Sequence, residues 1–139
     1  MSVLVDVNVL VAAHRADHPL HTQALGSLDG IGRDGFALCA HTWNGFLRLV
    51  THPQVFANPT PLPMALATVA AWRDRPRSEI LADTPTSWAI FARLCRQHHA
   101  TGNAMYDLHL AALAIAHDCS LLSHDQGFAR IATLRWVVS

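Results

Sequence analysis

The sequence of 139 residues contains no lysine and a single glutamate, Glu79. Its ten basic side chains are therefore all arginines, a residue type well suited to bidentate contacts with phosphate. Charged residues make up 14% of the chain, whereas about 25% is usual in soluble domains. With 51% hydrophobic residues, this scarcity of charge argues against disorder and leaves apolar surface for a partner. The formal net charge of zero argues against a strong electrostatic hold on nucleic acid by the whole chain.

No hydrophobic run reaches the roughly 18 residues of a transmembrane helix, because Asp107 and His109 interrupt the best candidate. Met1 leads directly into a strand pattern, so we expect no signal peptide. The cysteines are odd in number and lack paired spacing, which predicts buried, reduced thiols and neither disulfides nor a zinc site: Cys39, Cys95 and Cys119. We therefore expect one domain over residues 1–139, located in the cytoplasm and without a membrane partner.

Short apolar strands alternate with helical segments along the chain. Strands are predicted at residues 2–5, 36–40, 78–81, 120–123 and 134–138. Helices are predicted at residues 8–14, 18–28, 43–50, 64–72, 85–99 and 104–117. Thr42 and Thr84 are the expected caps of the third and fifth helices. The first strand is apolar on both sides, as in central parallel strands, and the alternation is typical of an α/β fold with a mainly parallel sheet.

Three aspartates stand at the ends of predicted elements. Asp6 follows the first strand, at the edge where open α/β sheets bind ligands in a crevice. Taken alone, Asp6 or the nearby Asn8 is explained as a helix cap. Asp125 repeats this arrangement just past the strand at 120–123. Asp107 lies in the first turn of an otherwise apolar helix, where the helix dipole alone would favour an acid.

Three carboxylates in one crevice repel each other unless a cation lies among them. Oxygen ligands with room for water and phosphate suit Mg²⁺ or Mn²⁺. Such a site polarises a phosphoryl oxygen and lowers the pKa of a bound water, which permits phosphodiester hydrolysis. The sequence therefore predicts a metal site with Asp6, Asp107 and Asp125 as ligands.

Four segments resemble a known family. Residues 4–10 (LVDVNVL), 102–114 (GNAMYDLHLAALA) and 121–130 (LLSHDQGFAR) resemble the acidic motifs of PIN-domain nucleases. Residues 45–53 (GFLRLVTHP) are similar to the VapC toxins of VapBC toxin–antitoxin pairs. The resemblance runs from residue 3 to Trp136, which is essentially the whole chain.

The resemblance implies a three-layer α/β/α sandwich and an endoribonuclease that uses Mg²⁺ or Mn²⁺. Hydrolysis would proceed by in-line attack of an activated water on phosphorus, without a covalent enzyme intermediate. It also implies a bacterial or archaeal toxin, a cognate antitoxin that blocks the site, and a homodimer. Asp6, Asp107 and Asp125 match the metal-binding acids of the family. Asn8 and Ser123 match polar residues that orient those acids.

The chain departs from the family pattern at two positions. The family usually has a glutamate on the helix after the second strand, where this chain has Asn44 or Gly45, depending on the register. Asn44 is a candidate catalytic residue, because its amide oxygen can face a metal or a metal-bound water. Gly127 stands where the family often has a further acid. A site charge of about −3, instead of −4 or −5, predicts weaker metal binding.

Other segments offer candidate contacts. Arg48 and Arg130 are candidates for contact with RNA phosphate, although surface arginines more often form ion pairs. The proline-rich residues 53–63 and the helix that follows are a candidate groove for the antitoxin. The ten histidines are scattered, and most are expected at the surface or as helix caps.

Two alternative functions stay open. A small phosphatase with Asp6 as nucleophile is disfavoured by Asn8, where that class generally has a second aspartate, and by the absence of lysine. A catalytically weakened domain would bind RNA or its antitoxin without efficient cleavage. The missing glutamate and the neutral net charge favour this second alternative.

Overall fold

The central sheet contains five parallel strands in the order β3-β2-β1-β4-β5. The computed structural model describes residues 2–32 and 34–139, so Met1, on which the expectation about a signal peptide rests, lies outside the described residues. The strands are β1 (Val3–Val5), β2 (Phe36–Leu38), β3 (Glu79–Ile80), β4 (Ser120–Ser123) and β5 (Trp136–Val138). The predicted parallel α/β sheet is confirmed.

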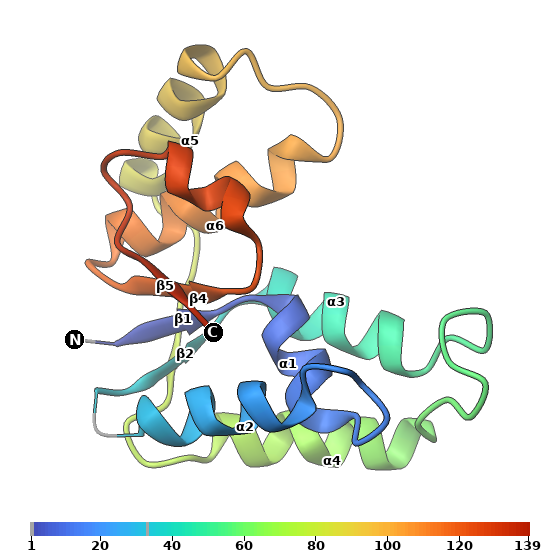
Figure 1. Ribbon diagram of the computed structural model, residues 1–139. Helices are drawn as coiled ribbons and strands as arrows, with labels where there is room; N and C mark the ends of the chain where they lie inside the picture. The colour runs from blue at the N-terminus through green and yellow to red at the C-terminus, as the bar shows by residue number, and fades with distance from the viewer. Residues whose placement is uncertain (1, 33) are drawn as a thin grey trace.

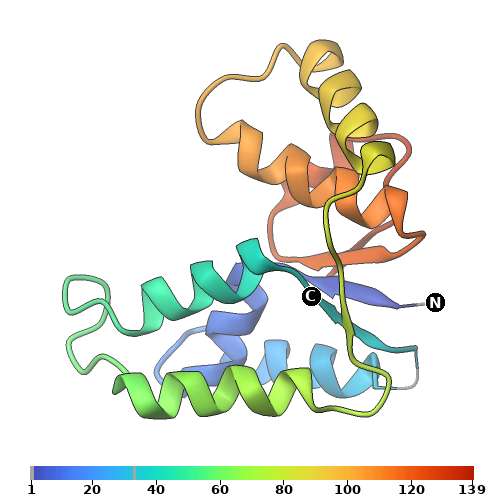
Figure 2. The same cartoon turned by 180° about the vertical axis from the view of Figure 1, so that it is seen from behind.

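Helices cover both faces of this sheet. They are α1 (Val7–His14), α2 (His21–Gly30), α3 (Ala40–Val50), α4 (Leu62–Arg73), α5 (Pro85–Gln97), α6 (Ala104–Ala116) and the 3₁₀ helix η1 (Gln126–Arg130). In Figure 1, α1 to α4 lie below the sheet and α5 and α6 lie above it, and Figure 2 shows the same layers from behind. The three-layer α/β/α sandwich is therefore confirmed.

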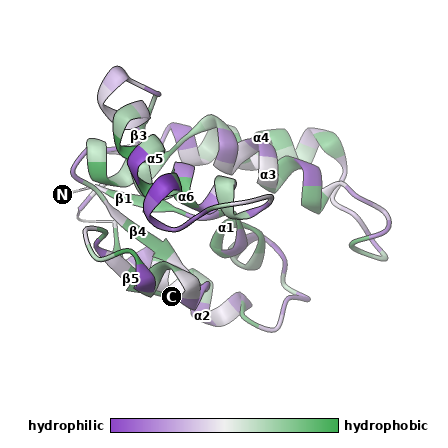
Figure 3. Ribbon diagram, turned by 90° about the horizontal axis from the view of Figure 1, so that it is seen from above, coloured by the Kyte–Doolittle hydropathy of each residue, from purple (hydrophilic) through white to green (hydrophobic). Residues whose placement is uncertain are grey.

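Each face of the sheet carries its own hydrophobic core, because alternate strand residues point in opposite directions. Val3 and Val5 pack with Phe46 of α3 on one face, whereas Leu4 packs with the hydrophobic residues of α5 and α6 on the other. In the view from above, α1 and β4, near the middle of the molecule, are coloured largely as hydrophobic (Figure 3). Burial on both faces explains why β1 is apolar at every position.

Four of the six helices begin at other residues than predicted. α1 begins one residue earlier, at Val7, and α4 two residues earlier, at Leu62. The differences at the second and third helices are larger and have local causes. The second helix begins at His21 instead of His18, because the ring Nδ1 of His18 accepts a hydrogen bond from the Leu20 N–H (3.0 Å) and shapes a turn before it. The third helix begins at Ala40, so Thr42 is not its cap. Thr42 Oγ1 instead accepts a hydrogen bond from the Cys39 N–H (3.0 Å), back across the first turn.

The predicted cap of the fifth helix is confirmed. Thr84 Oγ1 accepts a hydrogen bond from the Ser87 N–H at 3.0 Å, and the Ser87 hydroxyl in turn accepts one from the Thr84 N–H at 2.8 Å. These reciprocal bonds form a capping box, which satisfies two of the free N–H groups at a helix start. Pro85 occupies the first helical position, where the missing N–H costs nothing.

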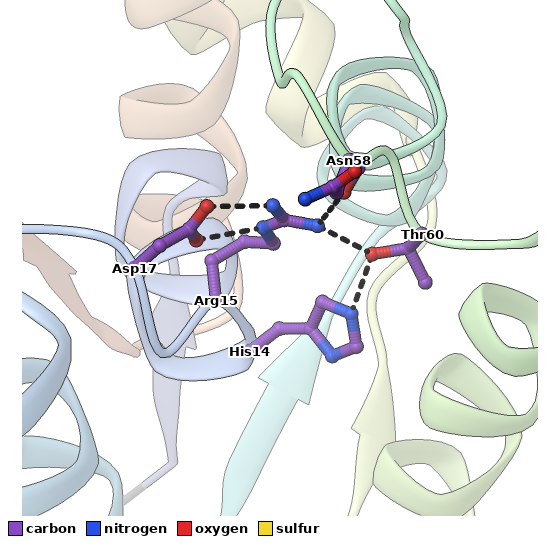
Figure 4. Close-up of polar contacts among 5 residues, drawn as sticks. All are labelled: His14, Arg15, Asp17, Asn58 and Thr60. Atoms are coloured by element: carbon purple, nitrogen blue, oxygen red, sulfur yellow. Dashed lines mark hydrogen bonds and ion pairs between the residues drawn. The ribbon is translucent and has the colours of Figure 1, made fainter.

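The loop between α3 and α4 is held against the end of α1 by polar contacts (Figure 4). Arg15 forms two hydrogen bonds with the carboxylate of Asp17, at 2.9 and 2.7 Å, and one with the carbonyl oxygen of Asn58 at 2.7 Å. Thr60 Oγ1 lies 3.0 Å from His14 Nε2 and accepts a further bond from Arg15 at 3.3 Å. These contacts fix the proline-rich loop in place.

The helices and the cysteines can be compared with the expectations from composition. Among the described residues, none of the helices combines the length and the apolar character needed to span a bilayer. Cys39 and Cys119 are buried free thiols, as predicted, whereas the free thiol of Cys95 is only partly buried.

Candidate active site

Asp6, Asp107 and Asp125 line one open pocket of about 360 Å³, which we call the carboxylate pocket. β1 and β4 are neighbours in the sheet, with Val5 opposite Leu122, so the residues that follow these strands lie close together. Asp107 reaches the pocket from the first turn of α6. The topology thus brings together the three acids that the sequence singled out.

Asp6 is the buried acid of this pocket, with 8% of its surface exposed. Its Oδ1 accepts a hydrogen bond from the Val7 N–H and its Oδ2 accepts one from the Ser123 hydroxyl, both at 2.7 Å. Asp6 therefore caps α1 and lines the pocket at the same time. Burial raises the pKa of Asp6 above its usual value, although both hydrogen bonds lower it, and the nearby charge of Asp125 raises it further.

Ser123 connects the two strand ends. Its fully buried hydroxyl donates to Asp6 and accepts hydrogen bonds from Asn8 Nδ2 (3.3 Å) and from the Asp125 N–H (3.0 Å). Asn8 Oδ1 in turn accepts a bond from the His124 N–H at 3.4 Å. Ser123 and Asn8 thus lie where they can orient the acids, as the resemblance implies.

The pKa of Asp107 depends on the charges of the other two acids. Burial raises its pKa, and the charges of Asp125 and Asp6 raise it further, while Arg130 and His41 lower it. Asp125 is exposed and is held by the Gly127 N–H, which donates to its Oδ1 at 2.8 Å. The pocket therefore concentrates negative charge that a cation would neutralise.

The donor chemistry of the carboxylate pocket fits a hard divalent cation, because the acids supply only oxygen atoms. Within residues 2–32 and 34–139, no three His, Cys, Asp or Glu side chains stand close enough to hold a metal ion as they are placed. Mg²⁺ usually keeps several waters and takes only one or two protein carboxylates. The spacing of the three acids therefore suits a cation that keeps several of its waters, and does not suit a cation bound by protein ligands alone.

Of the two candidate positions for the missing glutamate, Gly45 lines the carboxylate pocket and Asn44 does not. Asn44 is exposed and lines an adjoining pocket of about 510 Å³. Arg48 lines both pockets. A Cβ on Gly45 would lie only 2.7 Å from Val7 Cγ2, so α3 approaches α1 closely here because residue 45 has no side chain.

We expect Gly45→Ala to lower the free energy of unfolding by up to about 2 kcal/mol. Overpacking against Val7 typically costs about 1–3 kcal/mol, and alanine regains about 1 kcal/mol of helix propensity. In a Val7→Ala background the same substitution should cost nothing, because the methyl groups that it meets are gone. Urea denaturation of both single variants and the double variant measures the coupling; an equal cost in both backgrounds would contradict the contact.

The pocket also contains residues that sequence reasoning missed: His41, Asn103 and Tyr106. The ring of His41 stacks on that of Tyr106, with centroids 5.4 Å apart and planes 20° apart. Burial lowers the pKa of His41, and the nearby His109 lowers it further. The available signal was that His41 follows the second strand directly, the same placement that singled out Asp6.

The chain is similar to known proteins both in sequence and in structure. Residues 3–134 match the family described as PIN domain. Ribonuclease VapC25 from Mycobacterium tuberculosis is 36% identical over 136 residues, which cover 96% of each chain. Ribonuclease VapC43 from the same organism is 40% identical over 134 residues, covering 95% of this chain and 91% of the relative. The crystal structure of VapBC2 from Rickettsia felis, bound to a DNA fragment from their promoter, matches with a TM-score of 0.73 and 18% identity over 99% of this chain and 98% of that one, which shows a shared fold.

Proposed function

This chain belongs to the PIN-domain family, among relatives that are VapC ribonucleases, and we propose that it is the endoribonuclease toxin of a toxin–antitoxin pair. The observation that carries the proposal is the carboxylate pocket, where three acids from separate elements meet. Burial is the largest cause of the raised pKa values of Asp6 and Asp107, and the charge of Asp125 raises both further. Repulsion of this kind is costly to a fold and is typical of functional sites.

Asp6, Asp107 and Asp125 would surround one divalent cation, Mg²⁺ or Mn²⁺, and would reach it either directly or through its bound waters. Such a cation, when bound, would polarise a phosphoryl oxygen and lower the pKa of a water, which supplies the chemistry of phosphodiester hydrolysis. Because this chain has Gly45 at the pocket and no glutamate, the acids contribute a charge of about −3, and we expect cation binding to be weak.

The chain itself supplies orientation and phosphate binding. Val7 and Ser123 each donate one hydrogen bond to a different oxygen of Asp6, so this carboxylate keeps one orientation in the pocket. Arg48 lines the pocket and is exposed, which suits contact with an RNA phosphate. The positive charge of Arg130 acts on Asp107, so Arg130 can also contact an RNA phosphate at this edge of the sheet.

We further propose that an antitoxin covers the surface near α4, and that the toxin is a cytoplasmic, single-domain homodimer. Three large apolar side chains of α4 are strongly exposed, Leu62 (57%), Met64 (56%) and Leu66 (49%). A pocket of about 480 Å³ lies beside them and reaches the end of α1 at His14. Clustered exposed apolar side chains are typical of protein interfaces.

The test of the ribonuclease function is incubation of the purified, antitoxin-free protein with structured and unpaired RNAs in Mg²⁺, Mn²⁺ or EDTA. We expect cleavage with either cation and none in EDTA. Cleavage that persists in EDTA would contradict the metal-dependent mechanism. RNA binding without cleavage of any RNA would instead favour the weakened domain, and Asn44→Glu, which adds a carboxylate next to the site, would then test whether the missing glutamate is the cause.

A further inference from the structure

A row of ring side chains leads from the carboxylate pocket to α5. In order along the row, the rings are Tyr106, His41, His109, Phe91 and Trp88, which we call the aromatic row. We propose that the aromatic row is the surface of this chain that binds the unpaired bases of the RNA next to the scissile phosphate. This inference rests on the proposed ribonuclease function.

Each ring of the aromatic row contacts the next. From the stacked Tyr106 and His41, the row continues with His41 and His109, whose centroids are 6.4 Å apart. His109 and Phe91 are 6.0 Å apart, and Phe91 and Trp88 are 5.9 Å apart. Both ends of the row are open to solvent, since Tyr106 is 59% exposed and Trp88 is 67% exposed. Aromatic faces left in water in this way are available for stacking.

Three pockets lie along the aromatic row, and each shares lining residues with the next. The carboxylate pocket includes His41 and Tyr106. A second pocket of about 300 Å³ shares His41 with it and also includes Asp83 and His109. A third pocket of about 230 Å³ shares Asp83 and His109 and extends to Trp88. An RNA chain whose phosphate lies at the carboxylates can therefore place its neighbouring nucleotides in these pockets along the row.

The aromatic row also carries a hydrogen-bond acceptor for bases. Asp83 Oδ1 lies 2.7 Å from His109 Nε2, and the Asp83 side chain is 71% exposed. A carboxylate in this position can accept a hydrogen bond from the amino group of a base, as acids do from cytosine. The row therefore combines stacking faces with one group that favours bases bearing an amino group.

The charge of the chain favours stacking as the source of RNA affinity. Non-specific binding of nucleic acid depends mainly on positive charge, and this chain has a formal net charge of zero. Aromatic stacking holds unpaired bases of any sequence, because every base has a π face. Bases within a duplex are stacked on each other and cannot use such a surface. The aromatic row thus supplies what the charge balance does not, and it does so beside the acids.

The experiment measures binding of a labelled, unpaired RNA by fluorescence anisotropy, in an Asp107→Asn background that prevents cleavage. We expect Trp88→Leu and Tyr106→Leu each to weaken binding about tenfold, since one stacked base contributes about 1–3 kcal/mol. Leu25→Ala, which removes an exposed apolar side chain of α2 outside the row, should leave RNA affinity unchanged. The same RNA annealed to its complement should bind weakly to all variants.

The outcomes separate this inference from the function on which it rests. If the wild type cleaves RNA but Trp88→Leu and Tyr106→Leu bind unpaired RNA as tightly as their parent, the inference is wrong and the ribonuclease function stands. If Trp88→Leu turns a dimer into a monomer in light scattering and leaves RNA affinity unchanged, the row is an interface between two copies, which also overturns the inference. If the wild type cleaves no RNA, the proposed function fails first. In cleavage assays without the Asp107 substitution, Trp88→Leu should raise KM and leave kcat unchanged.

Discussion

Asp107→Asn is expected to cleave RNA at least about 100-fold more slowly than the wild type in Mg²⁺ or Mn²⁺. Loss of a group that merely orients a metal ligand typically costs about 10- to 100-fold, and Asp107 is placed as a ligand itself. The substitution keeps the size of the side chain and removes only its charge. The measurement is the single-turnover cleavage rate of one RNA at saturating protein.

The same variant should be at least as stable as the wild type when no cation is present. Burial and the charges of Asp125 and Asp6 raise the pKa of Asp107 in the folded state, so the folded state holds its proton more tightly than the unfolded state does. The stability of the wild type therefore falls as pH rises from the unfolded pKa through the raised folded pKa. Asp107→Asn removes this loss, so its stability relative to the wild type should increase as pH rises above about 4, the usual pKa of an aspartate.

Asp29→Asn is the matched control for this prediction. Asp29 is an exposed acid of α2 that does not line the carboxylate pocket, so its substitution should leave the cleavage rate unchanged. Two results would contradict the assignment of Asp107: a cleavage rate close to that of the wild type, or a loss of activity that is explained by unfolding of the variant.

Ser123→Ala is expected to lower the free energy of unfolding by about 1–3 kcal/mol at neutral pH. The substitution removes the hydroxyl that donates to the buried carboxylate of Asp6, and a buried charged group that loses a partner costs about this much. Without this donor the pKa of Asp6 should rise further, because the Ser123 hydrogen bond now lowers it. The cost should therefore shrink as pH falls towards the pKa of Asp6, where the carboxyl is protonated.

Urea denaturation at about pH 7 and about pH 5 tests this dependence, with Ser78→Ala as the control. The Ser78 hydroxyl is also buried, but it has no hydrogen-bond partner within the described part of the chain. Its removal should be neutral or slightly stabilising. A cost of Ser123→Ala that is the same at both pH values would contradict the link to the charge of Asp6.

The sequence predicted the sheet and the meeting of the three acids for a simple physical reason. Strands buried on both faces are apolar throughout, and the residues that follow neighbouring parallel strands share one edge of the sheet. Asp6 and Asp125 obey this rule directly. Asp107 was predicted to join them for another reason: a charged side chain in an otherwise apolar, buried helix is costly unless a partner such as a cation lies beside it.

Other features could not be predicted, because they depend on single side-chain hydrogen bonds or on contacts between distant residues. The start of α2 is shifted by the ring of His18, and the start of α3 by a bond that Thr42 makes to Cys39. The close approach of α3 to Val7 of α1 at Gly45 is likewise a contact that no local pattern records. The stacking of His41 on Tyr106 joins two helices in the same way.

The most direct test of a single cation site is the thermal stability of the protein during a titration with Mn²⁺. A ligand that binds only the folded state raises the melting temperature, and the rise grows with the logarithm of the ligand concentration above its Kd. We expect the melting temperature of the wild type and of Asp29→Asn to rise with Mn²⁺, and that of Asp6→Asn, Asp107→Asn and Asp125→Asn to rise much less. An equal rise in all five proteins, or no rise in the wild type, would contradict a cation site built from these three acids.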